Sequence, residues 1–281
     1  MFLVISPRPP PLHSVVPFGH SHRSYPVRVE RLWPTVTIWC PEGPFHRARF
    51  TVTPVPIVAA AVCPQPPLLV PELAAGAAAE LDDLRAACGQ ALHRLAETGP
   101  DRLVVISSGK DTTQVNMPFH ASFAPWGVPV RVGDGGAPLP LGLAVAVWLL
   151  HRRGWAADAL YTVATDLDPA GCATFGAELA SSVDRVALLA MGDGSACRGE
   201  KSPGYDDPRA EPYDDTVARA LGTADGDALR DLDPVLSAQL HAAGRAPWQV
   251  LAGVPAPWRA ELFYYAAPYG VAYFVAAWSR P

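Results

Sequence analysis

Lysine is almost absent from this sequence. Only Lys110 and Lys201 are lysines among the 22 basic residues, and the formal net charge is −5. Binding to nucleic-acid phosphates needs a concentrated positive surface. The composition supplies no such excess, so we expect no nucleic acid among the partners.

Long uninterrupted apolar runs are also missing. "PIVAAAVCPQPPLLVP" is broken by prolines and "LPLGLAVAVWLL" has 12 residues, whereas a membrane-spanning helix needs about 20. Only "FLVI" precedes Ser6 and Pro7 at the N-terminus, which is too short for the apolar region of a secretory signal. We therefore expect no membrane association and a cytoplasmic location.

The cysteines form no C-x-x-C pair, so the sequence shows neither a zinc module nor a disulfide framework. Reduced thiols in a reducing compartment fit this odd, scattered set, and we expect no metal site built on it. The five residues are Cys40, Cys63, Cys88, Cys172 and Cys197.

The first 50 residues differ in composition from the rest. They hold nine of the 31 prolines, six arginines against two glutamates, and four of the eight histidines. No period of 2 or 3.6 residues runs through them. We predict that residues 1–52 are a disordered extension, or upstream sequence translated from a start codon placed too early, and that residues 53–281 form one domain.

Beyond residue 56 the pattern alternates between strands and helices. A buried strand in "PIVAAAVC" precedes a helix over 72–97, and "RLVVI", "DALYTVATD" and "DRVALLAMGDG" predict further strands with helices between them. Helices around 209–221 and 225–244 follow, and "ELFYYAAP" and "GVAYFVAAW" predict an antiparallel pair. The fold class is therefore α/β: a single domain with a central mixed, largely parallel sheet flanked by helices, and C-terminal antiparallel strands.

Ligands of such sheets bind outside the carboxyl ends of the strands, so the polar residues that follow each strand are the candidates for a binding cleft. This set comprises Gln65, Ser107, Ser108, Asp193, Ser195 and Tyr205. For chemistry, His120, Asp193 and Ser195 are the candidate catalytic residues, with Lys201 beside them. A second interpretation stays open, in which these groups only satisfy backbone hydrogen bonds at strand ends.

Two common catalytic motifs are excluded. "SSGKDTT" has Val104 and Asp111 where a phosphate-binding loop needs glycine and a hydroxyl residue. "GDGSA" lacks the G-x-S-x-G frame of a hydrolase nucleophile. A serine that caps a turn is the ordinary alternative for Ser195.

Three segments taken together resemble the B-type subunits of class III extradiol ring-cleavage dioxygenases. They are "CPQPPLLVPE", "PDRLVVIS" and "GDGSACRGEKSPGYDDPRAEPYDDTVARAL", in order and spacing over roughly residues 55–281. The resemblance implies a non-haem Fe(II) held by two histidines and one carboxylate, with open positions for catechol and O2. It also implies a further histidine that transfers protons.

The sequence departs from that family at each of these positions. Gln65 stands where the first histidine is expected, Ser107 and Ser108 where the second is, and Ala196 where the proton-transferring histidine is. Residues 243–253 contain no glutamate for the carboxylate ligand. The resemblance thus implies a divergent member without the usual iron ligands, which needs no cofactor and keeps a cleft for a small aromatic or polar molecule.

Two alternatives remain open at this point. One is an active oxidoreductase, an aromatic ring-opening dioxygenase that holds Fe(II) with substituted ligands. The other is a non-catalytic scaffold partner in a complex. Homo-oligomers are compatible with all three interpretations.

Overall fold

Short segments rich in alanine and valine form the parallel centre of the main sheet in the computed structural model, which describes residues 28–32, 35–39, 48–51, 57–181, 184–255 and 257–281. These strands are β4 (Ala59–Cys63), β5 (Arg102–Gly109), β10 (Ala159–Ala164) and β11 (Val186–Met191). β11 lies between β4 and β5, and β10 pairs with the far side of β5. All four strands therefore end at the same edge.

Antiparallel strands complete this sheet on both sides. β13 (Tyr273–Ser279) pairs with β4, and β12 (Arg259–Ala266) pairs with β13. The two-residue β6 (Thr113–Gln114) pairs antiparallel with β10. The order is β12-β13-β4-β11-β5-β10-β6, which confirms the predicted mixed, largely parallel sheet and the C-terminal antiparallel pair.

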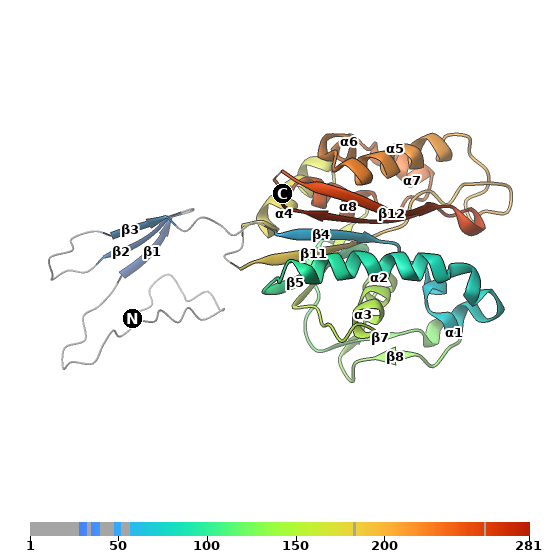
Figure 1. Ribbon diagram of the computed structural model, residues 1–281, viewed down its shortest axis with the longest axis horizontal. Coiled ribbons are helices and arrows are strands. Elements are labelled where there is room, and N and C mark those ends of the chain that lie inside the picture. Colours follow the sequence, from blue (N-terminus) through green and yellow to red (C-terminus); the bar gives the residue numbers. More distant parts are fainter. Residues whose placement is uncertain (1–27, 33–34, 40–47, 52–56, 182–183, 256) are drawn as a thin grey trace. The chain divides into compact units, whose positions relative to one another are not determined.

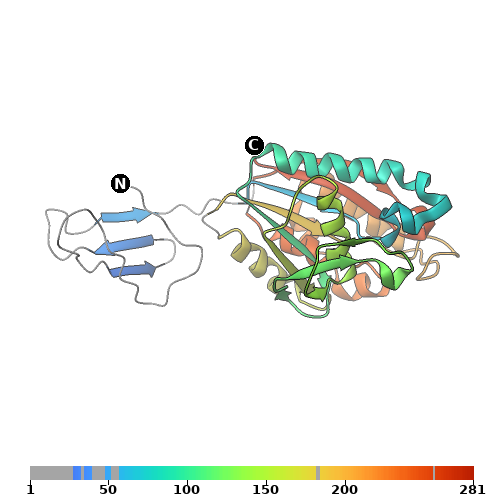
Figure 2. The same cartoon turned by 90° about the horizontal axis from the view of Figure 1, so that it is seen from below.

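The side chains of each central strand alternate between two apolar layers. In β4, Ala60 and Val62 join one core cluster, while Ala59, Ala61 and Cys63 join the other. One layer is covered by α4 (Pro169–Leu179), α5 (Ala210–Thr223), α6 (Gly226–Arg230) and α8 (Arg245–Ala252). The other is covered by α2 (Asp82–Glu97) and α3 (Leu141–His151). Figures 1 and 2 show these layers on opposite faces of the sheet.

The helix expected over 72–97 is broken into three elements. The structure has α1 (Pro71–Ala74), a 3-10 helix η2 (Ala75–Leu81) and then α2. The break comes at Ala75, whose φ is 47°, because an α-helix requires negative φ. The single long helix was therefore a wrong prediction at its N-terminal third.

α8 was not predicted, although its boundaries are readable. Gly244 and Gly253 flank it, and Pro247 lies in its first turn, where proline is tolerated because the amide has no partner within the helix. The helix expected around 225–244 is split at Asp233-Pro234 into α6 and α7 (Pro234–Gln239). A small sheet of β7 (Phe119–Ser122), β8 (Arg131–Val132) and β9 (Ala137–Pro138) follows β6.

The N-terminal unit has a sheet of its own. Contacts divide the chain between Pro54 and Val55, two residues from the predicted boundary. Its described residues form an antiparallel sheet of β1 (Arg28–Leu32), β2 (Thr35–Trp39) and β3 (Ala48–Thr51). Most of residues 1–52 lie outside the described residues, so the expectation of disorder or early translation stays a prediction.

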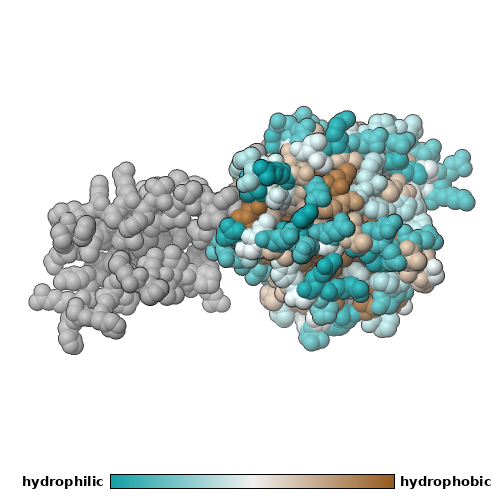
Figure 3. Space-filling view, in the orientation of Figure 1, coloured by the Kyte–Doolittle hydropathy of each residue, from teal (hydrophilic) through white to brown (hydrophobic). Residues whose placement is uncertain are grey.

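The polar surface and buried core agree with the hydropathy pattern of the sequence. Hydrophilic residues cover much of the described surface in Figure 3, with hydrophobic patches between them. Among the helices in the described ranges, none combines the length and apolar character that crossing a membrane requires.

Candidate functional site

Four of the predicted cleft residues are connected at the carboxyl ends of β4, β5 and β11. Ser107 Oγ donates a hydrogen bond to Gln65 Oε1 at 3.0 Å, and Gln65 Nε2 donates to Ser108 Oγ at 3.5 Å. The backbone amide of Gln65 donates to Asp193 Oδ1 at 2.8 Å. We call Gln65, Ser107, Ser108 and Asp193 the strand-edge cluster.

The strand-edge cluster is partly open to solvent. Ser107 is completely buried, whereas Gln65, Ser108 and Asp193 are half-buried. The three half-buried side chains carry an amide, a hydroxyl and a carboxyl group. Together they can donate hydrogen bonds to a small polar molecule and accept hydrogen bonds from it.

The first turn of α3 lies directly against this cluster. A Cβ at Gly142 would come within 2.0 Å of Ser107 Oγ and 2.2 Å of Gln65 Oε1, so only glycine fits without displacement. Pro140 precedes the helix and provides no side-chain cap. The partial positive charge of a helix N-terminus is therefore adjacent to the side-chain oxygen Oε1 of Gln65.

A second close approach fixes the backbone of Asp193. The Gly244 amide, at the start of α8, donates to the Asp193 carbonyl oxygen at 2.8 Å. A Cβ at Gly192 would lie 2.3 Å from Gly244 Cα. The two backbones touch because neither residue carries a side chain.

Burial raises the pKa of the Asp193 carboxyl group to about 7, and the hydrogen bond from the Gln65 amide opposes that rise. The buried Tyr273 is a neighbour: its pKa is raised by burial and by the charge of Asp193. A carboxyl group that titrates near neutral pH can both give and take a proton under ordinary conditions. Asp193 is thus the group in the cluster with acid and base capability.

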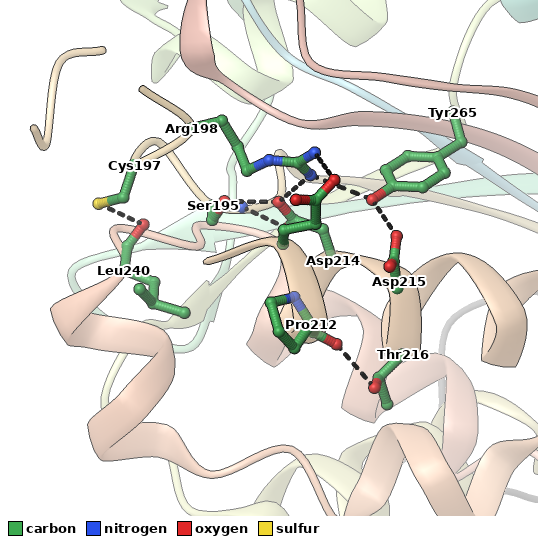
Figure 4. Close-up of polar contacts among 10 residues, drawn as sticks. Ser195, Cys197, Arg198, Pro212, Asp214, Asp215, Thr216, Leu240 and Tyr265 are labelled. Atoms are coloured by element: carbon green, nitrogen blue, oxygen red, sulfur yellow. Dashed lines mark hydrogen bonds and ion pairs between the residues drawn. The ribbon is translucent and has the colours of Figure 1, made fainter. Parts of the chain in front are cut away.

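Ser195 belongs to a different network, which is drawn in Figure 4. It is completely buried, its amide donates to Asp214 Oδ1 at 2.9 Å, and its hydroxyl donates to Asp214 Oδ2 at 2.5 Å. Arg198 Nη1 donates to Asp214 Oδ2 at 3.3 Å and to the Tyr265 hydroxyl oxygen at 3.1 Å. Burial raises the pKa of the Asp214 carboxyl group, while the bonds from Ser195 and Arg198 lower it.

This network joins the loop after β11 to α5 and β12. The Ser195 hydroxyl donates to the Asp214 carboxylate on α5 and not to a backbone group of its own turn, so it is not the turn cap that the alternative interpretation expects. Among the described residues, no hydrogen bond joins the Ser195 side chain to the strand-edge cluster. Tyr265 OH in turn donates to Asp215 Oδ1 at 2.7 Å. The role of the network in the described structure is to hold three elements together.

The other candidates lie apart from the cluster. Tyr205 is 78% exposed with φ 62°, and its carbonyl accepts a bond from Ser202 Oγ at 2.7 Å. His120, on β7, has Nδ1 3.1 Å from the Gly135 carbonyl oxygen. Lys201 is exposed. Within the part of the chain that the structure describes, no hydrogen bond or ion pair links these three residues to Gln65 or Asp193.

The donor set does not fit the iron centre that the resemblance implies. The strand-edge cluster offers an amide, two hydroxyls and one carboxyl group, with no imidazole, whereas such iron sites need two histidines. Ala196, after Ser195, carries no polar side-chain atom. Across the described ranges, no three or more His, Cys, Asp and Glu side chains are grouped closely enough to hold a metal ion.

Residues 243–253, where the resemblance places the glutamate ligand, include α8. They carry the buried Arg245 in place of a carboxylate. Arg245 Nη1 donates to the Leu167 carbonyl oxygen at 2.6 Å and to Gln249 Oε1 at 2.8 Å, and Nη2 donates to the Thr165 carbonyl oxygen. Arg245 is only 2% exposed. The sequence interpretation missed both this residue and Gly142, although a glycine near the start of an apolar helix was a readable signal.

Comparisons with known proteins add little about function. No family model matches the chain, and no curated protein matches it. One similar solved structure is that of the uncharacterized protein JW3007 from Escherichia coli K12, with 13% sequence identity and a TM-score of 0.46. The alignment covers 79% of this chain and 99% of that chain. A likeness at this level supports no functional argument.

Proposed function

We propose that this chain binds a small molecule bearing hydroxyl groups at the strand-edge cluster, as a divergent protein similar to the class III extradiol dioxygenases that lacks iron-dependent ring cleavage. The observation that carries the proposal is the convergence of Gln65, Ser108 and Asp193 at one partly exposed edge. These residues are far apart in sequence and meet only because β4, β5 and β11 are neighbours.

The chemistry of the cluster favours an aromatic diol or a similar polyol. An ionised Asp193 accepts hydrogen bonds from two adjacent hydroxyl groups, while Gln65 Nε2 and Ser108 Oγ can donate to their oxygens. Charge-assisted bonds of this kind are about twice as strong as neutral ones. The pKa of Asp193, about 7, makes the strength of such binding depend on pH near neutrality.

Thermal unfolding of the purified chain tests the proposal, because a ligand of the native state raises the melting temperature. Catechol is the probe, and 1,2-dimethoxybenzene, which has the same ring without hydroxyl donors, is its matched control. We expect catechol alone to raise Tm in the wild type. Asp193→Asn should abolish the shift, whereas Asp206→Asn, an exposed loop carboxylate, should preserve it.

Metal analysis of the same preparation separates binding from catalysis. The proposal expects no stoichiometric iron and no catechol turnover after addition of Fe(II). Iron bound at one equivalent together with ring opening would overturn it in favour of an active dioxygenase. No response to any diol would instead favour the scaffold alternative.

A further inference from the structure

A pocket of about 450 Å³ lies between α2 and α3. Its basic residues are Arg85 on α2 and Arg152 and Arg153 directly after α3. We call these three residues the arginine groove. The pocket's one acidic side chain, Asp82, is already 2.7 Å from Arg85 Nη1. The groove is therefore a locally positive site on a chain whose net charge is −5.

Two hydrogen bonds to backbone carbonyl oxygens place Arg85 at one side of the groove. Its Nε donates to the Leu69 carbonyl oxygen at 2.8 Å and its Nη1 to the Ala78 carbonyl oxygen at 2.7 Å. Its Nη2 is buried without a hydrogen-bond partner. A buried donor of this kind costs free energy until an acceptor reaches it, so a small shift of the side chain toward a bound anion would relieve that cost.

Arg153 is accommodated by a glycine on the facing helix. A Cβ at Gly89 would lie 1.9 Å from Arg153 Nη2, so the guanidinium rests directly on the backbone of α2. Glycine lowers helix propensity relative to alanine, yet Gly89 lies in the middle of this 16-residue helix. Within the described ranges, the Arg153 side chain has no hydrogen-bond or ion-pair partner.

Arg152, the third arginine of the groove, lies over the indole ring of Trp148. Its guanidinium carbon lies 5.2 Å from the ring centroid of Trp148, a cation–π arrangement that limits its orientations. Basic residues after α3 also complement the helix dipole. That role explains neither the position of Arg85, on another helix, nor the glycine beneath Arg153.

We propose that the arginine groove binds a phosphate-bearing small molecule. Guanidinium groups present planar pairs of donors that match phosphate oxygens, and three of them around one pocket suit a dianion better than a single carboxylate. This site is separate in its residues from the strand-edge cluster, so either proposal can fail while the other holds.

Isothermal titration with inorganic pyrophosphate tests the site, with glycerol phosphate as an organic ester and sodium acetate, a single carboxylate, at equal ionic strength as the comparison anion. We expect saturable binding of at least one of the two phosphate compounds and at least tenfold weaker binding of acetate. A preference for pyrophosphate would identify a diphosphate ligand, and a preference for the ester a monophosphate. Equal responses to all three anions would indicate ionic screening alone and overturn the proposal.

Variants locate the binding. Arg152→Gln together with Arg153→Gln should weaken it at least tenfold, whereas Arg131→Gln, which removes an exposed arginine of β8, should leave it unchanged. Gly89→Ala should also weaken binding, because its methyl group displaces the Arg153 guanidinium, while the higher helix propensity of alanine keeps α2 folded. Undiminished binding in both the double variant and Gly89→Ala would sink the assignment.

Discussion

The backbone amide of Gln65 donates a hydrogen bond to the side chain of Asp193 across 128 positions of sequence. β4 and β11 are adjacent parallel strands, and each residue stands two positions beyond the end of its strand. The bond joins the loops that leave these strands. It also places a carboxyl group with a raised pKa where Gln65 and Ser108 present their side chains.

Asp193 should make the stability of the protein depend on pH. Since its pKa is about 7 in the folded chain against 3.8 as the ordinary value, the native state holds a proton that the unfolded chain has lost between those values. Stability should therefore fall as pH rises through this window, by up to about 1.4 kcal/mol per pH unit. Asp193→Asn should remove that slope, which urea unfolding at several pH values measures. Equal slopes in both proteins would show that Asp193 ionises normally.

Gly142→Ala should destabilise the fold by about 1–3 kcal/mol, because the methyl group would collide with the buried Ser107 hydroxyl and with Gln65. Gly76→Ala is the matched control, since a Cβ there meets nothing within 4 Å. Chemical denaturation gives both values. Ser107→Ala in the Gly142→Ala background should recover part of the loss, because the two positions are in contact. Simple additivity of the two substitutions would contradict the described packing.

The network of Ser195, Arg198 and Asp214 should contribute to the stability of the fold and not to ligand binding. Asp214→Ala leaves the Ser195 amide and part of the Arg198 guanidinium without their acceptor, and should cost about 3 kcal/mol of unfolding free energy. Ser195→Ala keeps two donors to the carboxylate and should cost about 1 kcal/mol. Ser195→Ala should also retain the catechol-induced rise in Tm. A folded Ser195→Ala protein that no longer responds to catechol would place Ser195 in the binding site.

Removal of metal ions with a chelator should not change the thermal stability of the protein or its response to catechol. The strand-edge cluster has no imidazole, so dialysis against EDTA should alter neither the melting temperature nor the response to catechol. Differential scanning calorimetry before and after dialysis makes the comparison. A lower Tm that Fe(II) restores would reveal metal ligands other than the residues described above.

The sequence predicted the strand-edge cluster because parallel strands of one sheet end at a common edge, and Gln65, Ser107, Ser108 and Asp193 all follow or end such strands. The same rule could not place Ser195. It is only two residues beyond Asp193, but its partner Asp214 lies on α5, and a contact between a loop and a distant helix leaves no local pattern.

The prediction of one continuous helix over 72–97 failed for a similar reason. Its apolar spacing was satisfactory throughout, and the positive φ of Ala75 arises at a residue whose type favours helix. α8 was missed because a proline in its first turn resembles a helix breaker when the helix start is not known. For residues 72–97, tertiary packing selected a backbone that the local sequence does not specify, whereas the glycines that flank α8 were a readable signal.

The antiparallel pairing of β13 with β4 has a consequence for biosynthesis. Ala276 faces Val62 in this pair. β4 is the first strand of the main sheet to be synthesised and β13 is the last, so this side of β4 stays unpaired until β13 has been made. Until then one side of an alanine-rich, apolar strand keeps its backbone donors and acceptors unpaired, which is the kind of surface that recruits other chains. The nascent protein should therefore depend on chaperones late in translation, and its yield should respond more strongly to weakened β13 pairing than to changes in β6.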